Sequence, residues 1–121
     1  MAGCGAIDKS AFPQPARIAI RTLPSPGPDE VCMLAQHGGT LVVEPVSGVG
    51  LVDEIGRVTH VVWPYGYALR PDADRLALVD DQDRIAAHVG DRIIIGGGLG
   101  RDDEWIACLL EPITVLSTQS P

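Results

Sequence analysis

The sequence is poor in basic clusters and in aromatic residues. Lys and Arg number 9 against 16 Asp and Glu, so the formal net charge is -7. A negative average surface repels the phosphates of DNA and RNA, and an anionic membrane does not attract it. Two Trp, two Tyr and one Phe are too few for a platform that stacks single-stranded bases. Nucleic acid is therefore not expected as a partner.

Long apolar runs are also missing. No stretch approaches the roughly 18 consecutive apolar residues that a transmembrane helix needs, so the chain is not expected to span a membrane. Its 121 residues, 45% of them hydrophobic, suffice for one compact core. We therefore expect a single domain over residues 29–121.

The first residues match the end of a bacterial lipobox, in which Ala2-Gly3-Cys4 would supply the cysteine that takes up diacylglycerol. Met1 stands where a lipobox normally has Leu, and a charged and an apolar segment normally come before it. Residues 8–28 contain five prolines, a composition typical of an extended tether. We expect residues 1–28 to be a lipobox-like start and a Pro-rich tether, lipidated at Cys4. The alternative is an ordinary thiol in a disordered tail.

The other two cysteines are Cys32 and Cys108. An even number favours a disulfide in an exported domain. That bridge would close a loop of about 77 residues and stabilise the fold by roughly 4 to 5 kcal/mol in the chain-entropy model. Two buried thiols are the alternative, and they are expected if the protein is cytosolic. No Cys and His spacing indicates zinc, and we expect neither a metal nor a cofactor.

From residue 30 onward, short apolar or alternating runs end at Gly, Pro or Asp, which is typical of strands and tight turns. Residues 31–36 and 40–44 flank His37-Gly38-Gly39, so we expect them to form an antiparallel hairpin. Residues 102–110 are the one segment compatible with a short helix, since Trp105, Cys108 and Leu109 fall on a common helical face. Further extended segments are expected at 49–52, 57–63, 65–70, 75–79, 84–88, 92–95 and 113–116, with 92–95 stopping at the glycines that follow.

This pattern predicts an all-β, mainly antiparallel fold with about seven to eight short strands and at most one helix. A small OB-like barrel is the favoured architecture, because closure removes exposed strand edges. A small β-sandwich is the alternative.

The order of motifs between residues 29 and 98 resembles a group of small Gram-positive bacterial lipoproteins of unassigned function. These motifs are a first strand with Cys32, the stretch from Val62 to Tyr67, the Asp-rich turn 80–83, and Val89-Gly90-Asp91 leading to the glycines 96–98. They cover about 60% of the chain. The resemblance implies a lipid anchor and a β-barrel, and it implies no activity.

Candidate chemistry is sparse. The glycines 96–100 lack the following helix and Lys-Ser/Thr of a phosphate-binding loop, and the Asp residues between 72 and 83 lack the Gly and Glu of a calcium loop, so both are expected to form turns. The alternation of Trp63, Tyr65 and Tyr67 puts three rings on one face, where they could line a groove. Core packing is the competing interpretation.

We expect a lipid-anchored binding or interaction module on the extracellular face of the cell membrane, with no catalytic activity and an unknown partner. A lipid on Cys4 would be its only contact with the membrane. One alternative is a cytosolic OB-like module in a larger assembly. The other is a small hydrolase that uses His60 or His88, which requires a His close to both an acid and a nucleophile.

Overall fold

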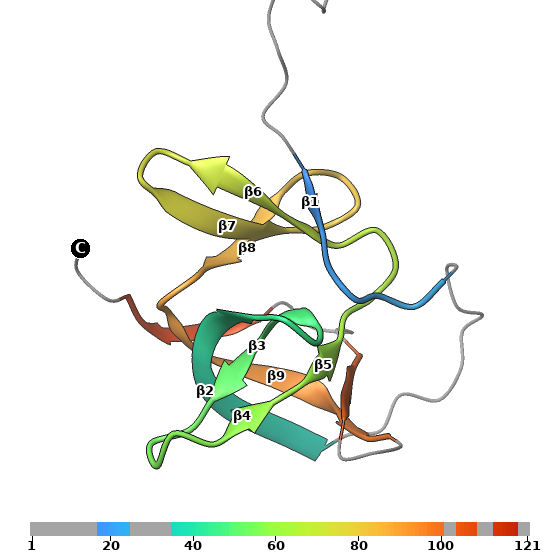
Figure 1. Ribbon diagram of the computed structural model, residues 1–121, viewed down its shortest axis with the longest axis vertical. Coiled ribbons are helices and arrows are strands. Elements are labelled where there is room, and N and C mark those ends of the chain that lie inside the picture. Colours follow the sequence, from blue (N-terminus) through green and yellow to red (C-terminus); the bar gives the residue numbers. More distant parts are fainter. Residues whose placement is uncertain (1–16, 25–34, 101–103, 109–112, 119–121) are drawn as a thin grey trace, which may run out of the picture.

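The computed structural model describes residues 17–24, 35–100, 104–108 and 113–118, and every regular element in these ranges is a strand (Figure 1). The prediction of an all-β, mainly antiparallel fold is therefore confirmed. Within the same ranges no helix is long and apolar enough to cross a bilayer. The strands are β1 (Ile18–Ala19), β2 (Ala35–Glu44), β3 (Gly48–Val52), β4 (Val58–Thr59), β5 (Val61–Val62), β6 (Ala68–Asp72), β7 (Arg75–Val79), β8 (Ile85–His88), β9 (Arg92–Leu99), β10 (Trp105–Ala107) and β11 (Thr114–Ser117).

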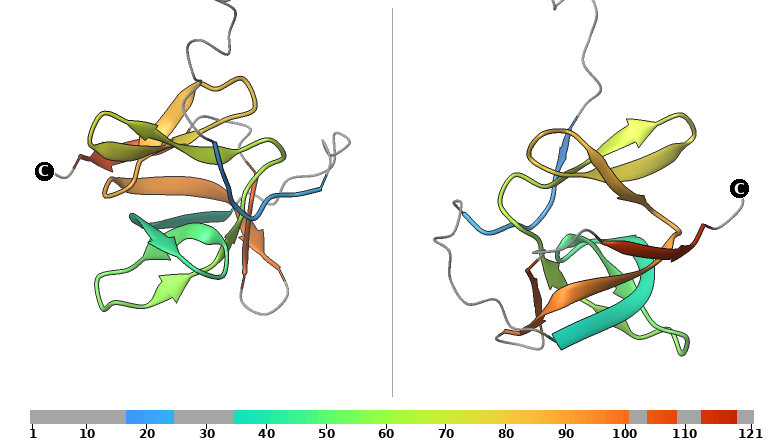
Figure 2. Two further views of the ribbon diagram at one scale, coloured as in Figure 1. Left: turned by 45° about the horizontal axis from the view of Figure 1, so that its top comes forward. Right: turned by 180° about the vertical axis from the view of Figure 1, so that it is seen from behind.

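Seven strands form a sheet that curls into a barrel. Their order is β4-β3-β2-β9-β10-β5, with β11 also paired to β9. The first and last strands of this order, β4 and β5, are separated in the chain only by His60. The sheet therefore returns upon itself, as the views in Figure 2 show. The neighbours in this order pair antiparallel except β10 and β5, which are parallel.

A smaller sheet with the order β1-β6-β7-β8 lies against the barrel (Figure 1). Its two hairpins turn at Ala73 and Asp83, which both adopt positive φ angles. The two sheets share one core, because Leu69 and Leu78 of the small sheet belong to the same buried cluster as Trp63 of the barrel.

Part of the expected tether belongs to the folded domain. Residues of β1 pair with β6, and Arg21 donates its backbone N–H to the carbonyl of Ser47. Trp63 donates its own backbone N–H to Arg21 and accepts one from Leu23. The folded unit therefore begins before residue 29, because this segment satisfies backbone groups of both sheets.

The expected hairpin turn at His37-Gly38-Gly39 is wrong. β2 runs through these residues without a break, because β9 pairs with them from Ile95 to Ile93. The hairpin instead joins β2 to β3 around residues 45–47. In the same way β9 continues through the glycines and ends at Leu99, where a stop at Ile95 was expected.

The expected helix over residues 102–110 is also wrong in its described part. Trp105–Ala107 form β10, which pairs with β9 on one edge and with β5 on the other. Pairing on both edges, with β9 nearby and β5 distant in the sequence, thus fixes an extended conformation that local periodicity does not reveal.

Candidate functional site

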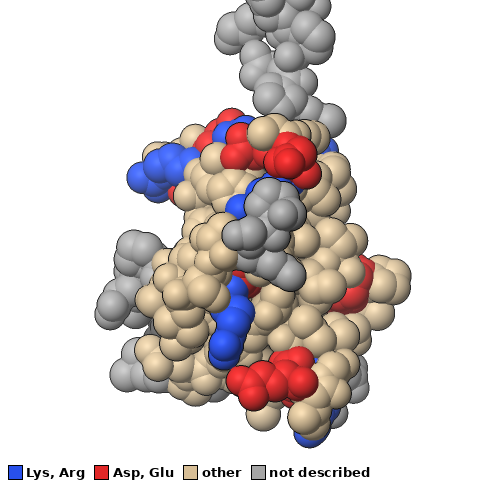
Figure 3. Space-filling model, turned by 90° about the vertical axis from the view of Figure 1, so that its left-hand side faces the viewer, with Lys and Arg blue, Asp and Glu red and all other residues tan. Residues whose placement is uncertain are grey.

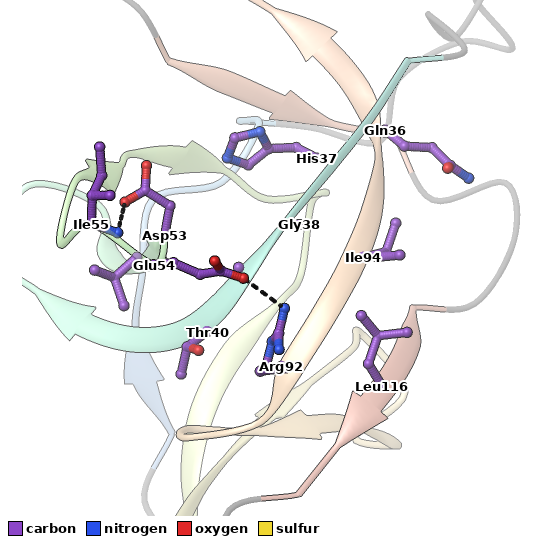
Figure 4. Close-up of a pocket in the computed structure, with 12 residues that line it drawn as sticks. Gln36, His37, Gly38, Thr40, Asp53, Glu54, Ile55, Arg92, Ile94 and Leu116 are labelled. Atoms are coloured by element: carbon purple, nitrogen blue, oxygen red, sulfur yellow. Dashed lines mark hydrogen bonds and ion pairs between the residues drawn. The ribbon is translucent and has the colours of Figure 1, made fainter.

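A groove of about 710 Å³ crosses the N-terminal half of β2 (Figure 4). We call it the β2 groove. Gly38 and Thr40 of β2 line it, Ile94 and Leu116 lie on one side of the strand, and Asp53 and Ile55 lie on the other. Ile55 is 76% exposed and Leu116 is 53% exposed. The β2 groove therefore has apolar side chains at both borders.

One ion pair crosses this groove. The guanidinium of Arg92 in β9 lies 3.5 Å from a carboxylate oxygen of Glu54, which belongs to the turn between β3 and β4 (Figure 4). Both side chains are largely exposed, at 55% and 86%. Exposed pairs contribute only about 0 to 1 kcal/mol, so a ligand can displace this contact at small cost.

Asp53 shapes the wall of the β2 groove. Its carboxylate accepts the backbone N–H groups of Ile55 at 3.0 Å and Arg57 at 2.8 Å. Its backbone N–H also bonds the carbonyl of Arg57. These bonds hold a tight turn directly after Val52, the last residue of β3. Val52 pairs with Thr40 near the middle of β2, so β3 stops about half-way along its neighbour.

His37 is partly buried and contacts two other strands of the barrel. Its Nε2 atom lies 3.0 Å from the hydroxyl of Thr59, and its ring centroid lies 5.1 Å from that of Trp105. The imidazole thus links β2 to β4 and β10.

A second hollow of about 410 Å³ lies between β1 and the β2–β3 turn, and Ile18, Ile20, Leu69 and Leu76 contribute to its apolar lining. Glu44 is the single ionisable side chain that lines it. That carboxylate is occupied by the turn bonds described next, so the hollow offers a ligand less polar recognition than the β2 groove.

Buried Glu44 and Ser47 form a hydrogen-bonded cluster with His60, whose side chain is 36% exposed. The Glu44 carboxylate accepts hydrogen bonds from the backbone N–H of Val46 at 2.7 Å and from the hydroxyl of Ser47, and it lies 3.0 Å from Nδ1 of His60. Ser47 is 1% exposed. Its hydroxyl bonds the carboxylate and not the imidazole, so the cluster lacks the Ser–His contact of a hydrolase triad. These hydrogen bonds connect the β2–β3 turn to His60 and to the start of β5.

His88, the other histidine considered for catalysis, pairs with Asp72 at 2.7 Å. This hydrogen bond is the largest cause of a lowered pKa of Asp72. Nearby, the buried carboxylate of Asp91 accepts the backbone N–H of His88 and lies 2.9 Å from the guanidinium of Arg75. These contacts tie together the strands of the small sheet and the start of β9.

The three alternating aromatic residues occupy different environments. Trp63 is 0% exposed and donates its indole N–H to the carbonyl of Val49 at 2.9 Å. The ring of Tyr67 stacks on it with centroids 6.3 Å apart. Burial, followed by the charges of Asp80 and Asp81, raises the pKa of Tyr67. Tyr65 is 45% exposed, and none of the three borders the β2 groove.

Of the three cysteines, Cys4 and Cys32 lie outside the described residues. Cys108 follows β10, donates its backbone N–H to Gly96 and is disulfide-bonded. Its partner lies outside the described ranges, so the pairing with Cys32 stays a prediction.

Charged side chains on the face in Figure 3 form small groups of both signs on a mostly uncharged surface. No group of three or more His, Cys, Asp or Glu side chains suited to a metal ion occurs within residues 17–24, 35–100, 104–108 and 113–118.

Sequence reasoning missed the β2 groove, although one signal was present. Gly38 and Gly39 lie inside β2, and a glycine inside a strand can mark the close approach of another backbone. Comparison of the chain with protein-family models, curated proteins and solved structures found no match. The function must therefore be argued from the geometry of the groove.

Proposed function

We propose that this protein is an exported, lipid-anchored binding module and that the β2 groove is its binding site. The observation that carries the proposal is the groove itself. Its volume of about 710 Å³ lies within the roughly 300 to 1,000 Å³ of ordinary ligand sites. It combines the apolar borders of Ile55 and Leu116 with the displaceable pair of Glu54 and Arg92.

Two features support the lipid anchor and export. Ala2-Gly3-Cys4 has the composition of a lipobox end, and a segment with Pro13 and Pro15 lies between it and β1 in the sequence. The disulfide-bonded state of Cys108 fits an oxidising compartment, where such bonds persist. In this proposal Cys32 is the partner, so the bridge ties the segment before β2 to the strand after β9.

Binding is tested with a fragment library and ¹H–¹⁵N NMR spectra of the folded protein. We expect the shifted amides to concentrate at Gly38, Thr40 and Ile94. Leu116→Ala removes an apolar border and should weaken these hits by about threefold or more. Fully burying a large aliphatic side chain is worth about 1.5 kcal/mol or more, and Leu116 is 53% exposed, so a ligand can gain about half of that. Ile85→Ala is the matched control, because Ile85 is a similarly exposed strand residue outside the groove. Hits that avoid the β2 groove would refute the assignment of the site.

The anchor is tested by growing a bacterium that expresses the natural gene with an alkyne-tagged fatty acid. The wild-type protein should incorporate the label and remain with the membrane fraction, and Cys4→Ala should do neither. An unlabelled protein in the cytoplasm with a reduced Cys108 would favour the cytosolic alternative and overturn this part of the proposal.

A further inference from the structure

We infer that the β2 groove takes an extended peptide, which adds to β2 as a further strand and lays an aromatic side chain over Gly38. The inference rests on the proposed function, because it names the ligand class of the same groove. Three observations lead to it: an open backbone edge, a glycine that packing does not require, and apolar side chains beside that glycine.

The open edge follows from the register of β2. Residues 35–40 pair with β9, but β3 pairs with β2 only from Thr40 onward. In an antiparallel ladder alternate residues direct their N–H and C=O groups to opposite edges. Leu41 donates to the carbonyl of Asp91 and accepts from the N–H of Gly90, so the odd-numbered residues of β2 face β9.

Gln36 and Gly38 therefore direct their backbone groups away from β9. On that edge, no strand in the described part of the chain pairs with residues 35–39. Two residues offer two donors and two acceptors, spaced as the edge of a sheet presents them. Strand addition to such an edge is a general mode of peptide recognition, in which main-chain hydrogen bonds provide affinity.

Gly38 has no packing reason to be glycine. A Cβ built at this position would lie 3.4 Å from the Ile93 carbonyl oxygen and 3.6 Å from Cγ1 of Ile94, which are ordinary contacts. By contrast, a Cβ at Gly50 would lie 2.5 Å from the Thr59 carbonyl oxygen. Glycine weakens the interior of a strand, so its presence at a site with room for a side chain indicates that the open surface is used.

The neighbours of Gly38 indicate which side chain would cover it. Ile94 lies directly across the β2–β9 ladder from Gly38, and both Ile94 and Leu116 line the groove. An aromatic ring opposite a glycine on a neighbouring strand can cover the bare backbone and contact the flanking side chains. We therefore expect the peptide residue that faces Gly38 to be aromatic.

A second copy of this chain fits the edge less well than a free peptide. The edge is recessed, with the β3–β4 turn and Ile55 on one side and Leu116 on the other. The β2 edge of a second molecule would be recessed in the same way, so the two edges could not approach to hydrogen-bonding distance. A single extended segment meets no such obstacle.

The test uses a random peptide library displayed on phage, panned against the folded protein. A selected peptide is then synthesised with single amide-to-ester replacements along its backbone, each of which deletes one donor. Esters at every second position should weaken binding about two- to tenfold, and esters at the intervening positions should not, because only alternate residues face β2. Selected peptides should share an aromatic residue whose replacement by Ala weakens binding about tenfold.

Gly38→Pro gives an independent readout on the protein side. It removes a donor that faces the groove and leaves the bonds to β9 intact, and proline is tolerated on edge strands in that orientation. Gly38→Ala is the matched control, since it keeps the donor. Both variants should unfold at similar urea concentrations, and Gly38→Pro should bind the peptide more weakly than Gly38→Ala by about tenfold.

Three outcomes would overturn the inference. One is an unchanged affinity of the selected peptide for Gly38→Pro, or an ester series without alternation. Another is a concentration-dependent dimer that Gly38→Pro abolishes, which would assign the edge to a second copy. The third is that the library yields no peptide that binds at β2, while fragments still shift the amide NMR signals of Gly38 and Ile94. That last result would leave the proposed binding site standing and remove only its peptide ligand.

Discussion

Replacing Trp63 by Phe tests whether this ring belongs to the core. Trp63 and its acceptor Val49 are both 0% exposed, so water cannot replace the lost indole hydrogen bond. An unsatisfied buried carbonyl costs about 1 to 3 kcal/mol. The smaller ring also leaves a void, which adds about 1 kcal/mol in comparable large-to-small changes. We therefore expect Trp63→Phe to destabilise the protein by about 2 to 4 kcal/mol, out of a typical total of about 5 to 15 kcal/mol.

The assay is urea unfolding followed by the fluorescence of Trp105, which remains as the only tryptophan in the variant. Tyr65→Phe is the matched control, because Tyr65 is 45% exposed and most surface changes stay within about 0.5 kcal/mol. A loss below about 1 kcal/mol for Trp63→Phe would refute the reasoning and would revive the interpretation of Trp63 as part of a solvent-facing groove.

Two further predictions concern the stability of the protein in acid and the substitution of Gly97. Burial raises the pKa of Asp80, but hydrogen bonds from Arg84 and Gln82 outweigh it and leave the pKa below 3.8. The Asp80 carboxylate therefore contributes its full stabilisation above the unfolded-state pKa, and this stabilisation is lost as the pH falls through the lower pKa of the folded state. We expect the urea midpoint of Asp80→Asn to fall less steeply with acid than that of the wild-type protein. Gly97 has a φ of 139°, and in Gly97→Ala the new Cβ would overlap the carbonyl of Ile106. Calorimetry should therefore show that the free energy of unfolding falls by about 3 kcal/mol or more, against about 1 kcal/mol or less for Gly38→Ala.

Several strands could be predicted from local sequence alone. The expected segments 49–52, 75–79 and 84–88 coincide with β3, β7 and β8 to within a residue at either end. Each is a short apolar or alternating run enclosed by turn residues, so its boundaries are encoded locally. Their division between two sheets, with β3 in the barrel and β7 and β8 in the smaller sheet, could not be predicted from these local runs.

The errors share one cause, which is that local sequence does not show what a strand pairs with. Glycine at 38 and 97 suggested turns, but both positions lie inside long strands. At Gly97 the reason is close approach, since a side chain there would overlap β10. Trp105 fitted a helical face, yet Val61 and Leu99 hold it in a strand from both sides.

The candidate site could not be predicted for a related reason, because it arises from a difference in strand length. β2 has 10 residues and β3 has 5, so β3 covers only the second half of its neighbour. The bonds of the Asp53 carboxylate to the N–H groups of Ile55 and Arg57 turn the chain away at that point. If residues 53 and 54 continued β3 instead, they would pair with the edge at Gly38 and close the groove. The turn bonds of the Asp53 carboxylate therefore keep the backbone edge at Gly38 open.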